Sequence, residues 1–248
     1  QPFEHEFHWT REDTSLAMSV NLLFYGLTAP FAATFMARYS VRKVGSIGLA
    51  LVAAGSGLTI FMTEVWQLVL LWGALVGIAT GSLALVGGAM VASRWFVKGR
   101  SLVTGIFSAA YATGSLIFLP LVSSLVEQTG WRTAVMTIAG FAIIVSLLFA
   151  IFFRESPAAV GQLPFGANAP IKVEAKAPIS MRGNFQALAK YSKGFPFWAL
   201  ASTFFVCGWT TNGLIGAHFI PAAHDHGMGL TTASSLLAVV GIFDIIGT

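Results

Sequence analysis

Hydrophobic residues fall into long uncharged runs, and short hinges between the runs carry the charges. An α-helix needs about 20 mostly apolar residues to cross a bilayer. Six runs reach that length, at residues 16–37, 44–63, 65–93, 101–126, 133–153 and 195–217, and a seventh begins near residue 230 and continues to the end of the chain. The pattern predicts an all-α membrane protein with about seven transmembrane helices, six of them complete and the last truncated.

Composition points the same way. Hydrophobic residues make up 56% of the chain and charged residues only 10%, whereas soluble domains carry about 25% charged residues. The single cysteine, Cys207, excludes an internal disulfide framework and a cysteine-based metal site. No basic stripe stands beside a soluble module, so no nucleic-acid partner is expected.

The distribution of cations predicts the orientation. All 14 Lys and Arg residues except Arg11 and Arg132 lie in the segments after the first, third and fifth runs. The positive-inside rule makes these segments cytoplasmic. The first residues of the chain are therefore expected on the outer side.

One connection is long, and it divides the chain. Residues 154–194 contain four prolines and read as a cytoplasmic central linker. Its later part, 179–193, alternates apolar and basic residues, which fits either a short amphipathic helix on the inner leaflet or a solvated basic linker. The predicted domains are 1–153, a helical half without its first helix, the linker 154–194, and 195–248, the start of a second half.

The ends of the chain suggest a piece of a longer protein. It opens on Gln1 without a signal-peptide pattern and stops at Thr248 within an apolar run. One more helix upstream would place six helices before the linker and the N-terminus inside. We expect two six-helix halves joined by a cytoplasmic linker.

The hinge at residues 33–43 resembles a family signature. The major facilitator superfamily carries Gly-x3-Asp-Arg-x-Gly-x-Arg between its second and third helices, and Arg38, Arg42 and Lys43 match its cations. Ala33, Ala37 and Ser40 replace the Gly, Asp and Gly. Losing the carboxylate at Ala37 puts the family's cytoplasmic ion-pair latch in doubt, and the three cations could also be ordinary positive-inside residues.

Further motifs resemble the monocarboxylate-transporter and oxalate/formate-antiporter branch of that superfamily. They are Trp9-Thr10-Arg11, Arg94-Trp95-Phe96-x-Lys98-x-Arg100, Gly130-Trp131-Arg132, Arg154-x2-Pro157-x3-Gly161-x2-Pro164 and the segment 212–225. The resemblance runs from the family's helix two to part of helix eight. It implies a major facilitator fold and a bacterial inner-membrane carrier that moves a small organic anion by alternating access.

Asp244 is the most informative single side chain, because an ionisable residue within a span is costly and functional by default. In monocarboxylate transporters the eighth helix carries Asp-x3-Arg, with the acid implicated in proton coupling and the arginine in carboxylate binding. The resemblance gives Asp244 the role of the acid. Thr248 stands where the arginine is expected, which weakens the case for a carboxylate bound there.

Uncharged polar residues and glycines complete the candidate pathway. Asn21 and Tyr25 share a helix face, and Thr211 and Asn212 belong to a polar cluster in the sixth run. These groups suit a substrate site between repeats or plain interhelical hydrogen bonds; packing is favoured for Asn21 and the substrate site for Asn212. Small residues spaced four apart predict close helix packing, either beside a cavity or as static contacts; they include Gly73, Gly77, Gly81 and Gly105.

A histidine cluster lies at the outer end of the sixth run. His218, His224 and His226 with Asp225 could bind a transition metal or sense pH. A hydrated loop without either role is favoured, so no metal and no cofactor are predicted.

The predicted function is secondary active transport of a small solute, with the lipid bilayer, the solute and protons as partners. The chain lacks a phosphate-binding Gly-x4-Gly-Lys-Ser/Thr loop and the common catalytic motifs, so an enzyme is not expected. Proton-antiport efflux by the same fold is the main alternative. A seven-helix receptor is disfavoured, because the last run has no lysine for a retinal Schiff base and one cysteine cannot form the usual extracellular disulfide.

Overall fold

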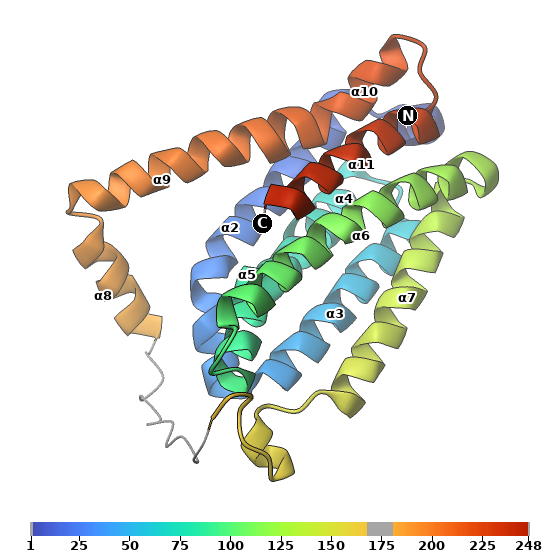
Figure 1. The fold of residues 1–248 in the computed structure, drawn as a ribbon. Coiled ribbons are helices and arrows are strands. Elements are labelled where there is room, and N and C mark those ends of the chain that lie inside the picture. Colours follow the sequence, from blue (N-terminus) through green and yellow to red (C-terminus); the bar gives the residue numbers. More distant parts are fainter. Residues whose placement is uncertain (1, 168–180, 248) are drawn as a thin grey trace. The chain divides into compact units, whose positions relative to one another are not determined.

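The computed structural model describes residues 2–167 and 181–247. Within these residues the chain forms helices (Figure 1), and one isolated β-bridge joins Phe96 to Phe165. The all-α fold predicted from the apolar runs is confirmed. Helices are the expected secondary structure in a membrane, because each helix forms its backbone hydrogen bonds internally and needs no water.

Five helical segments are long and apolar enough to cross a membrane. They are α2 (Arg11–Tyr39), α3 (Val41–Leu58) with η1 (Thr59–Phe61), α4 (Val65–Leu68) with η2 (Val69–Val76) and α5 (Gly77–Trp95), α6 (Arg100–Thr129), and α7 (Trp131–Phe152). They correspond to the first five predicted spans. The π-helix η2 interrupts the third of them without breaking it.

The remaining described elements are shorter. They are α1 (Pro2–Phe7), η3 (Pro157–Val160), α8 (Met181–Tyr191), α9 (Phe195–Gly208), the π-helix η4 (Trp209–Gly216), α10 (Ala217–Asp225) and α11 (Leu230–Gly247). α9, η4 and α10 follow one another without a break, so the sixth predicted span is helical. Among the described residues it is not one of the helices that are long and apolar enough to cross a membrane.

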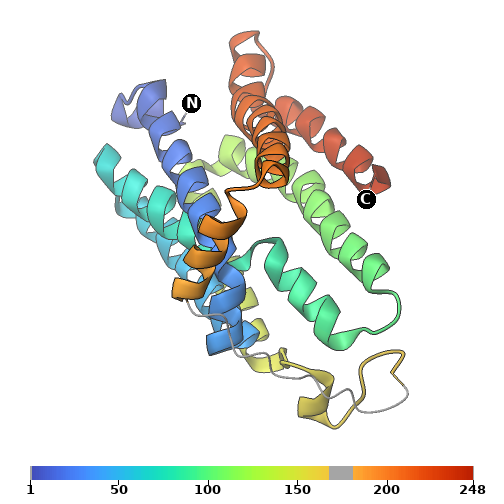
Figure 2. The ribbon, with the colours of Figure 1, turned by 90° about the vertical axis from the view of Figure 1, so that its left-hand side faces the viewer.

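Packing divides the chain into two compact units. The first comprises Gln1–Phe107 and Trp131–Pro178, and the second comprises Ser108–Gly130 and Ile179–Thr248. In the first unit α2 packs along α5 and η2, and α3 packs along α7 and α5, as two perpendicular views show (Figures 1 and 2). In the second unit α11 packs against α10. The sequence-based domain boundaries stay a prediction.

Most of the buried apolar residues in the described part of the chain are alanines, and many large apolar residues are exposed. Ala17 and Ala32 of α2 and Ala79 of α5 are buried, whereas Phe141 of α7 and Leu102 of α6 are exposed. Lipid tails solvate apolar side chains as well as a protein core does, so membrane helices bury small residues where their backbones approach one another. This arrangement suits a bilayer.

The linker contains a helix in the stretch whose pattern fits either an amphipathic helix or a solvated basic linker. α8 covers Met181–Tyr191, and Phe185, Leu188 and Tyr191 on it are exposed. Lys172 and Lys176 of the same linker lie outside the described residues. The placement of α8 on the inner leaflet stays a prediction.

Candidate functional site

The hinge between α2 and α3 consists of one residue, Ser40. Its φ of 84° and ψ of 147° fall in a region of backbone space that is essentially reserved for glycine. The family signature has glycine at this place, and the geometry supplies the reason. The Ser40 hydroxyl compensates in part, because it accepts a hydrogen bond from the backbone N–H of Lys43 (3.2 Å) and caps α3.

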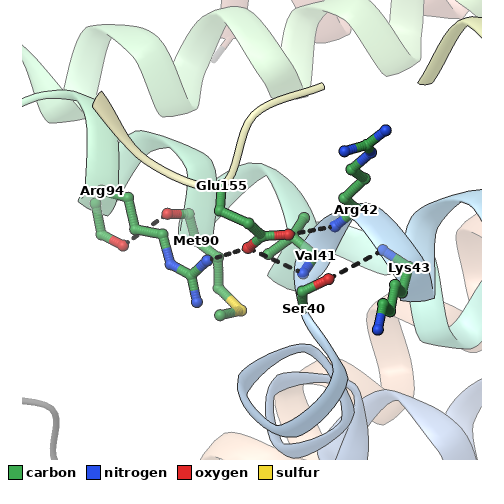
Figure 3. Close-up of polar contacts among 8 residues, drawn as sticks. Ser40, Val41, Arg42, Lys43, Met90, Arg94 and Glu155 are labelled. Atoms are coloured by element: carbon green, nitrogen blue, oxygen red, sulfur yellow. Dashed lines mark hydrogen bonds and ion pairs between the residues drawn. The ribbon is translucent and has the colours of Figure 1, made fainter. Parts of the chain in front are cut away.

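A carboxylate from a distant segment completes this hinge. Glu155 follows α7, and its Oε1 accepts a hydrogen bond from the backbone N–H of Arg42 (2.7 Å), while Oε2 accepts one from the N–H of Val41 (3.2 Å). Oε2 also pairs with Nη1 of Arg94 in the last turn of α5, at 2.7 Å. Figure 3 shows Glu155 between the start of α3 and the end of α5.

Electrostatics explain why an acid suits this position. The N-terminus of a helix carries partial positive charge, and the first turn of α3 contains no acidic residue of its own. Burial of the carboxylate raises the pKa of Glu155. The hydrogen bonds from Arg42, Val41, Ser40 and Arg94 outweigh burial, so the pKa of Glu155 lies below its ordinary value.

The three predicted hinge cations have different surroundings. Arg42 donates from Nε to the carbonyl of Ala150 near the end of α7. Its side chain therefore links the start of α3 to the end of α7, as the contacts of Glu155 also do. The Arg38 guanidinium lies 5.4 Å from the ring centroid of its neighbour Tyr39. Lys43 is exposed.

Sequence reasoning missed Glu155, although a signal was present. It is one of the few acids in segments that the cations mark as cytoplasmic, and it stands within the quoted motif that begins at Arg154. Its contacts bring a carboxylate to the start of α3, in a hinge where Ala37 stands in place of the signature's acid. A motif search along one hinge cannot detect a partner 114 residues away.

The glycine row of η2 and α5 lies directly on α2. A Cβ added to Gly73, Gly77 or Gly81 would lie 3.1, 2.7 or 2.6 Å from a backbone carbonyl oxygen of α2, at Ala17, Asn21 and Tyr25 respectively. Only glycine permits two backbones to approach this closely. Gly105 lies in α6 and is partly exposed.

Asn21 contacts the same helix pair. Its Nδ2 donates to the carbonyl of Trp72 within the π-helix η2 (2.8 Å). This contact supports the interhelical alternative for Asn21. Tyr25, one turn further on, has 37% of its surface exposed.

The remaining candidate pathway residues belong to the second unit. Thr211 lies in η4, with its hydroxyl 4.0 Å from Sγ of Cys207, and the neighbouring Thr210 hydroxyl donates to carbonyls of its own helix. Asn212 lies in η4 and Asp244 in α11, but their side chains, like Thr248, are outside the described residues. No geometry is therefore assigned to either side chain.

A polar and aromatic cluster forms where α1 meets α7, which the cation pattern predicts to be the outer side. Glu6 accepts hydrogen bonds from Nε1 of Trp131 (2.5 Å) and from the guanidinium of Arg132. These hydrogen bonds hold the pKa of Glu6 below its ordinary value, and the bond from Trp131 has the largest effect. The rings of Phe3 and Trp131 meet edge to face at 4.9 Å.

In the sequence, His218, His224 and His226 are possible metal ligands. Among the described residues, no group of three or more His, Cys, Asp and Glu side chains is placed to hold a metal ion. His226 directs Nδ1 at the carbonyl of Ala222, at 2.8 Å.

Comparisons with known proteins agree with this architecture. A model of the Major Facilitator Superfamily matches residues 1–248. The chain is 27% identical to the uncharacterized MFS-type transporter YcxA of Bacillus subtilis (99% of this chain, 56% of that protein). It is 26% identical to monocarboxylate transporter 12-B of Danio rerio (89% and 49%) and 24% identical to monocarboxylate transporter 11 of Homo sapiens (97% and 47%).

These proteins are transporters rather than enzymes by their names. The chain spans about half the length of these relatives. The family match, together with five helices suited to a membrane and the glycine-type hinge between α2 and α3, identifies a polytopic membrane protein. The chain belongs to the Major Facilitator Superfamily.

Proposed function

We propose that this chain provides most of the first half, and the start of the second, of a secondary transporter that moves a small organic anion by alternating access. Three described features of the first unit support a half that moves as one body: the Glu155 contacts, the α2–α5 backbone approach and the α3–α7 packing. Rocking of one helical half against the other requires such rigidity. The main supporting observation is the Glu155 tie, the set of contacts by which Glu155 binds the start of α3 and Arg94 of α5.

The substrate class rests on similarity. Two relatives are named as monocarboxylate transporters, at 24% and 26% identity. We assign Asp244, Thr211 and Asn212 to the substrate and proton pathway, and we assign Tyr25 of α2 to the same pathway. Asn21 is assigned to the pathway wall, where its amide holds α2 against η2.

Proton-coupled efflux of drugs or metabolites is the second candidate. One observation favours it: Thr248 stands four residues after Asp244, where monocarboxylate transporters carry an arginine. A site without that arginine has lost a bidentate partner for a carboxylate. The bacterial relative also makes a bacterial inner membrane our proposed location.

The test is uptake of formate, oxalate, lactate and pyruvate by the complete protein in liposomes, with an imposed proton gradient. The same assay is run with Asp244→Asn. Proton-dependent uptake that the variant loses would support an organic-anion carrier coupled through Asp244. If none of the four anions is taken up and a cationic dye is exported in a proton-driven manner, the result would support proton-coupled efflux instead.

A further inference from the structure

The N-terminus of α11 receives a carboxylate from another helix. Glu127 Oε1 accepts a hydrogen bond from the backbone N–H of Thr231 (3.1 Å), and Oε2 accepts one from the Thr231 hydroxyl (2.5 Å). Both oxygens of one acid therefore bind the first turn of α11. The first N–H groups of a helix lack partners within the helix, so such a contact satisfies groups that would otherwise need water.

The position of Glu127 is explained by this contact and not by its own helix. It lies in the last turn of α6, where the helix carries partial negative charge and an acid is unfavourable. The first turn of α11 is the opposite case: it carries partial positive charge and contains no acidic residue of its own. The charge of Glu127 therefore complements α11 and opposes α6.

The contact links the two halves of the chain. Glu127 precedes the central linker and Thr231 follows it, 104 residues later, and both belong to the second compact unit. The cation pattern predicts that the end of α6 and the start of α11 lie on the outer side. α6 begins at the cation-rich hinge that contains Arg100, and α11 begins after the run that leaves the cation-rich linker.

We propose that Glu127 and Thr231 form an outer latch that holds the two halves together when the carrier is closed to the outside. This inference rests on the proposed alternating-access function. Opening to the outside separates the end of α6 from the start of α11, so both hydrogen bonds break in every transport cycle. Substrate or proton binding must compensate for that loss, and the strength of the latch sets the ratio of the two states.

The test measures the distance across the latch in the complete protein. Nitroxide labels are placed at Gln128 and Thr232, which are exposed neighbours of the two latch residues. Within these 248 residues Cys207 is the one cysteine, so Cys207→Ser gives this part of the chain a cysteine-free background. Pulsed electron resonance in liposomes then gives the populations of short and long label distances.

Four variants distinguish loss of the latch from general destabilisation of the protein. Glu127→Ala is expected to raise the ratio of long to short distances by roughly tenfold, since it removes both hydrogen bonds to a charged group. Thr231→Val removes the hydroxyl bond but keeps the N–H, and is expected to give a smaller increase. Thr231→Ser keeps both donors and should match the wild type. Glu64→Ala is the matched control, because Glu64 is an exposed outer acid that caps its own helix α4.

Each outcome is decisive. Unchanged distances in Glu127→Ala and Thr231→Val, in a protein whose distances still respond to substrate, would overturn the latch and leave the transport proposal intact. The latch would also be overturned if Glu64→Ala raised the ratio of long to short distances as much as Glu127→Ala does. Solute flux is measured on the same samples: if the wild type moves none of the tested solutes, the proposed function fails, and the distance ratios still report on the latch contact.

Discussion

At the scale of single residues, Ser40 keeps the backbone conformation that the glycine of the family signature would adopt, although the residue itself is not glycine. The hinge has a backbone conformation with φ of 84° and ψ of 147°, which costs a non-glycine residue about 1–3 kcal/mol. Serine remains tolerable because its hydroxyl caps α3. A side chain with neither glycine's freedom nor a capping oxygen has no such compensation.

We therefore expect Ser40→Ala to lower the free energy of unfolding by about 1 kcal/mol, the usual loss for a helix cap. Ser40→Gly is expected to be neutral or stabilising, because relief of backbone strain offsets the lost cap. Thermal unfolding of the detergent-solubilised protein measures both. Ser93→Ala serves as the control, since that exposed hydroxyl bonds only within its own helix. A Ser40→Gly protein less stable than Ser40→Ala would contradict this account.

Glu155 gives a pH dependence whose sign follows from its contacts. Its pKa in the folded protein lies below the ordinary value, so the charged form stabilises the fold. That stabilisation is complete above about pH 4.3, the ordinary pKa of glutamate, and is lost as the pH falls through the lower folded value. Glu155→Gln is expected to melt at a lower temperature near neutral pH.

The measurement is the difference in melting temperature between wild type and Glu155→Gln from pH 7 to pH 3. The difference should narrow below about pH 4.3, because the wild-type acid then also becomes neutral. A constant difference down to pH 3 would show that the carboxylate charge is irrelevant. Arg94→Gln should reproduce part of the effect through the ion pair.

At the scale of elements, the α2–α5 contact depends on glycine at close backbone approach. A Cβ at Gly77 would lie 2.7 Å from the Asn21 carbonyl oxygen, a distance that forces the helices apart. We expect Gly77→Ala to destabilise the protein by about 1–3 kcal/mol, the range for overpacking. The readout is thermal unfolding in detergent.

Gly140→Ala in α7 is the matched control, because nothing lies within 4 Å of a Cβ built there. Alanine is a better helix former than glycine by up to about 1 kcal/mol, so this variant should be neutral or stabilised. Equal destabilisation of both variants would mean that the glycines act through backbone flexibility and not through packing.

At the scale of the whole molecule, the tie at Glu155 should matter for motion more than for binding. Glu155→Gln in the complete protein is expected to lower the maximal transport rate by roughly tenfold, about 1.4 kcal/mol, with little change in substrate KM. Initial rates in liposomes over a range of substrate concentrations measure both parameters. Arg38→Gln is the control, since Arg38 contacts the ring of its neighbour Tyr39. A change in KM with unchanged maximal rate would place Glu155 in the binding site instead.

Much of the molecule was predictable from local pattern. The five long helices follow from apolar runs, and the superfamily followed from motifs such as the hinge cations and Gly130-Trp131-Arg132. The sixth run was helical as predicted, but among the described residues it is not one of the five helices apolar enough to cross a membrane. The sites of Asp244 and Asn212 were named from the sequence alone and remain predictions.

The contacts that join distant segments were not predictable in this way. In the sequence Glu155 resembled one more charge in a linker, and Glu127 resembled one more acid in a hinge predicted to lie on the outer side. Their partners are separated from them by 114 and 104 residues, and no spacing rule connects such positions. The glycine row predicted a close approach, but not that α2 would be the partner.

The amino-acid sequence by itself determined where helices form, and it predicts which hinges face the cytoplasm, because both depend on local quantities. A helix in a bilayer satisfies its own backbone, and cations are retained on the inner side one hinge at a time. Only the tertiary structure decided which carboxylate caps which helix, because that depends on which helix ends packing brings within hydrogen-bonding distance. Glu155 at α3 and Glu127 at α11 are both cases of this second kind.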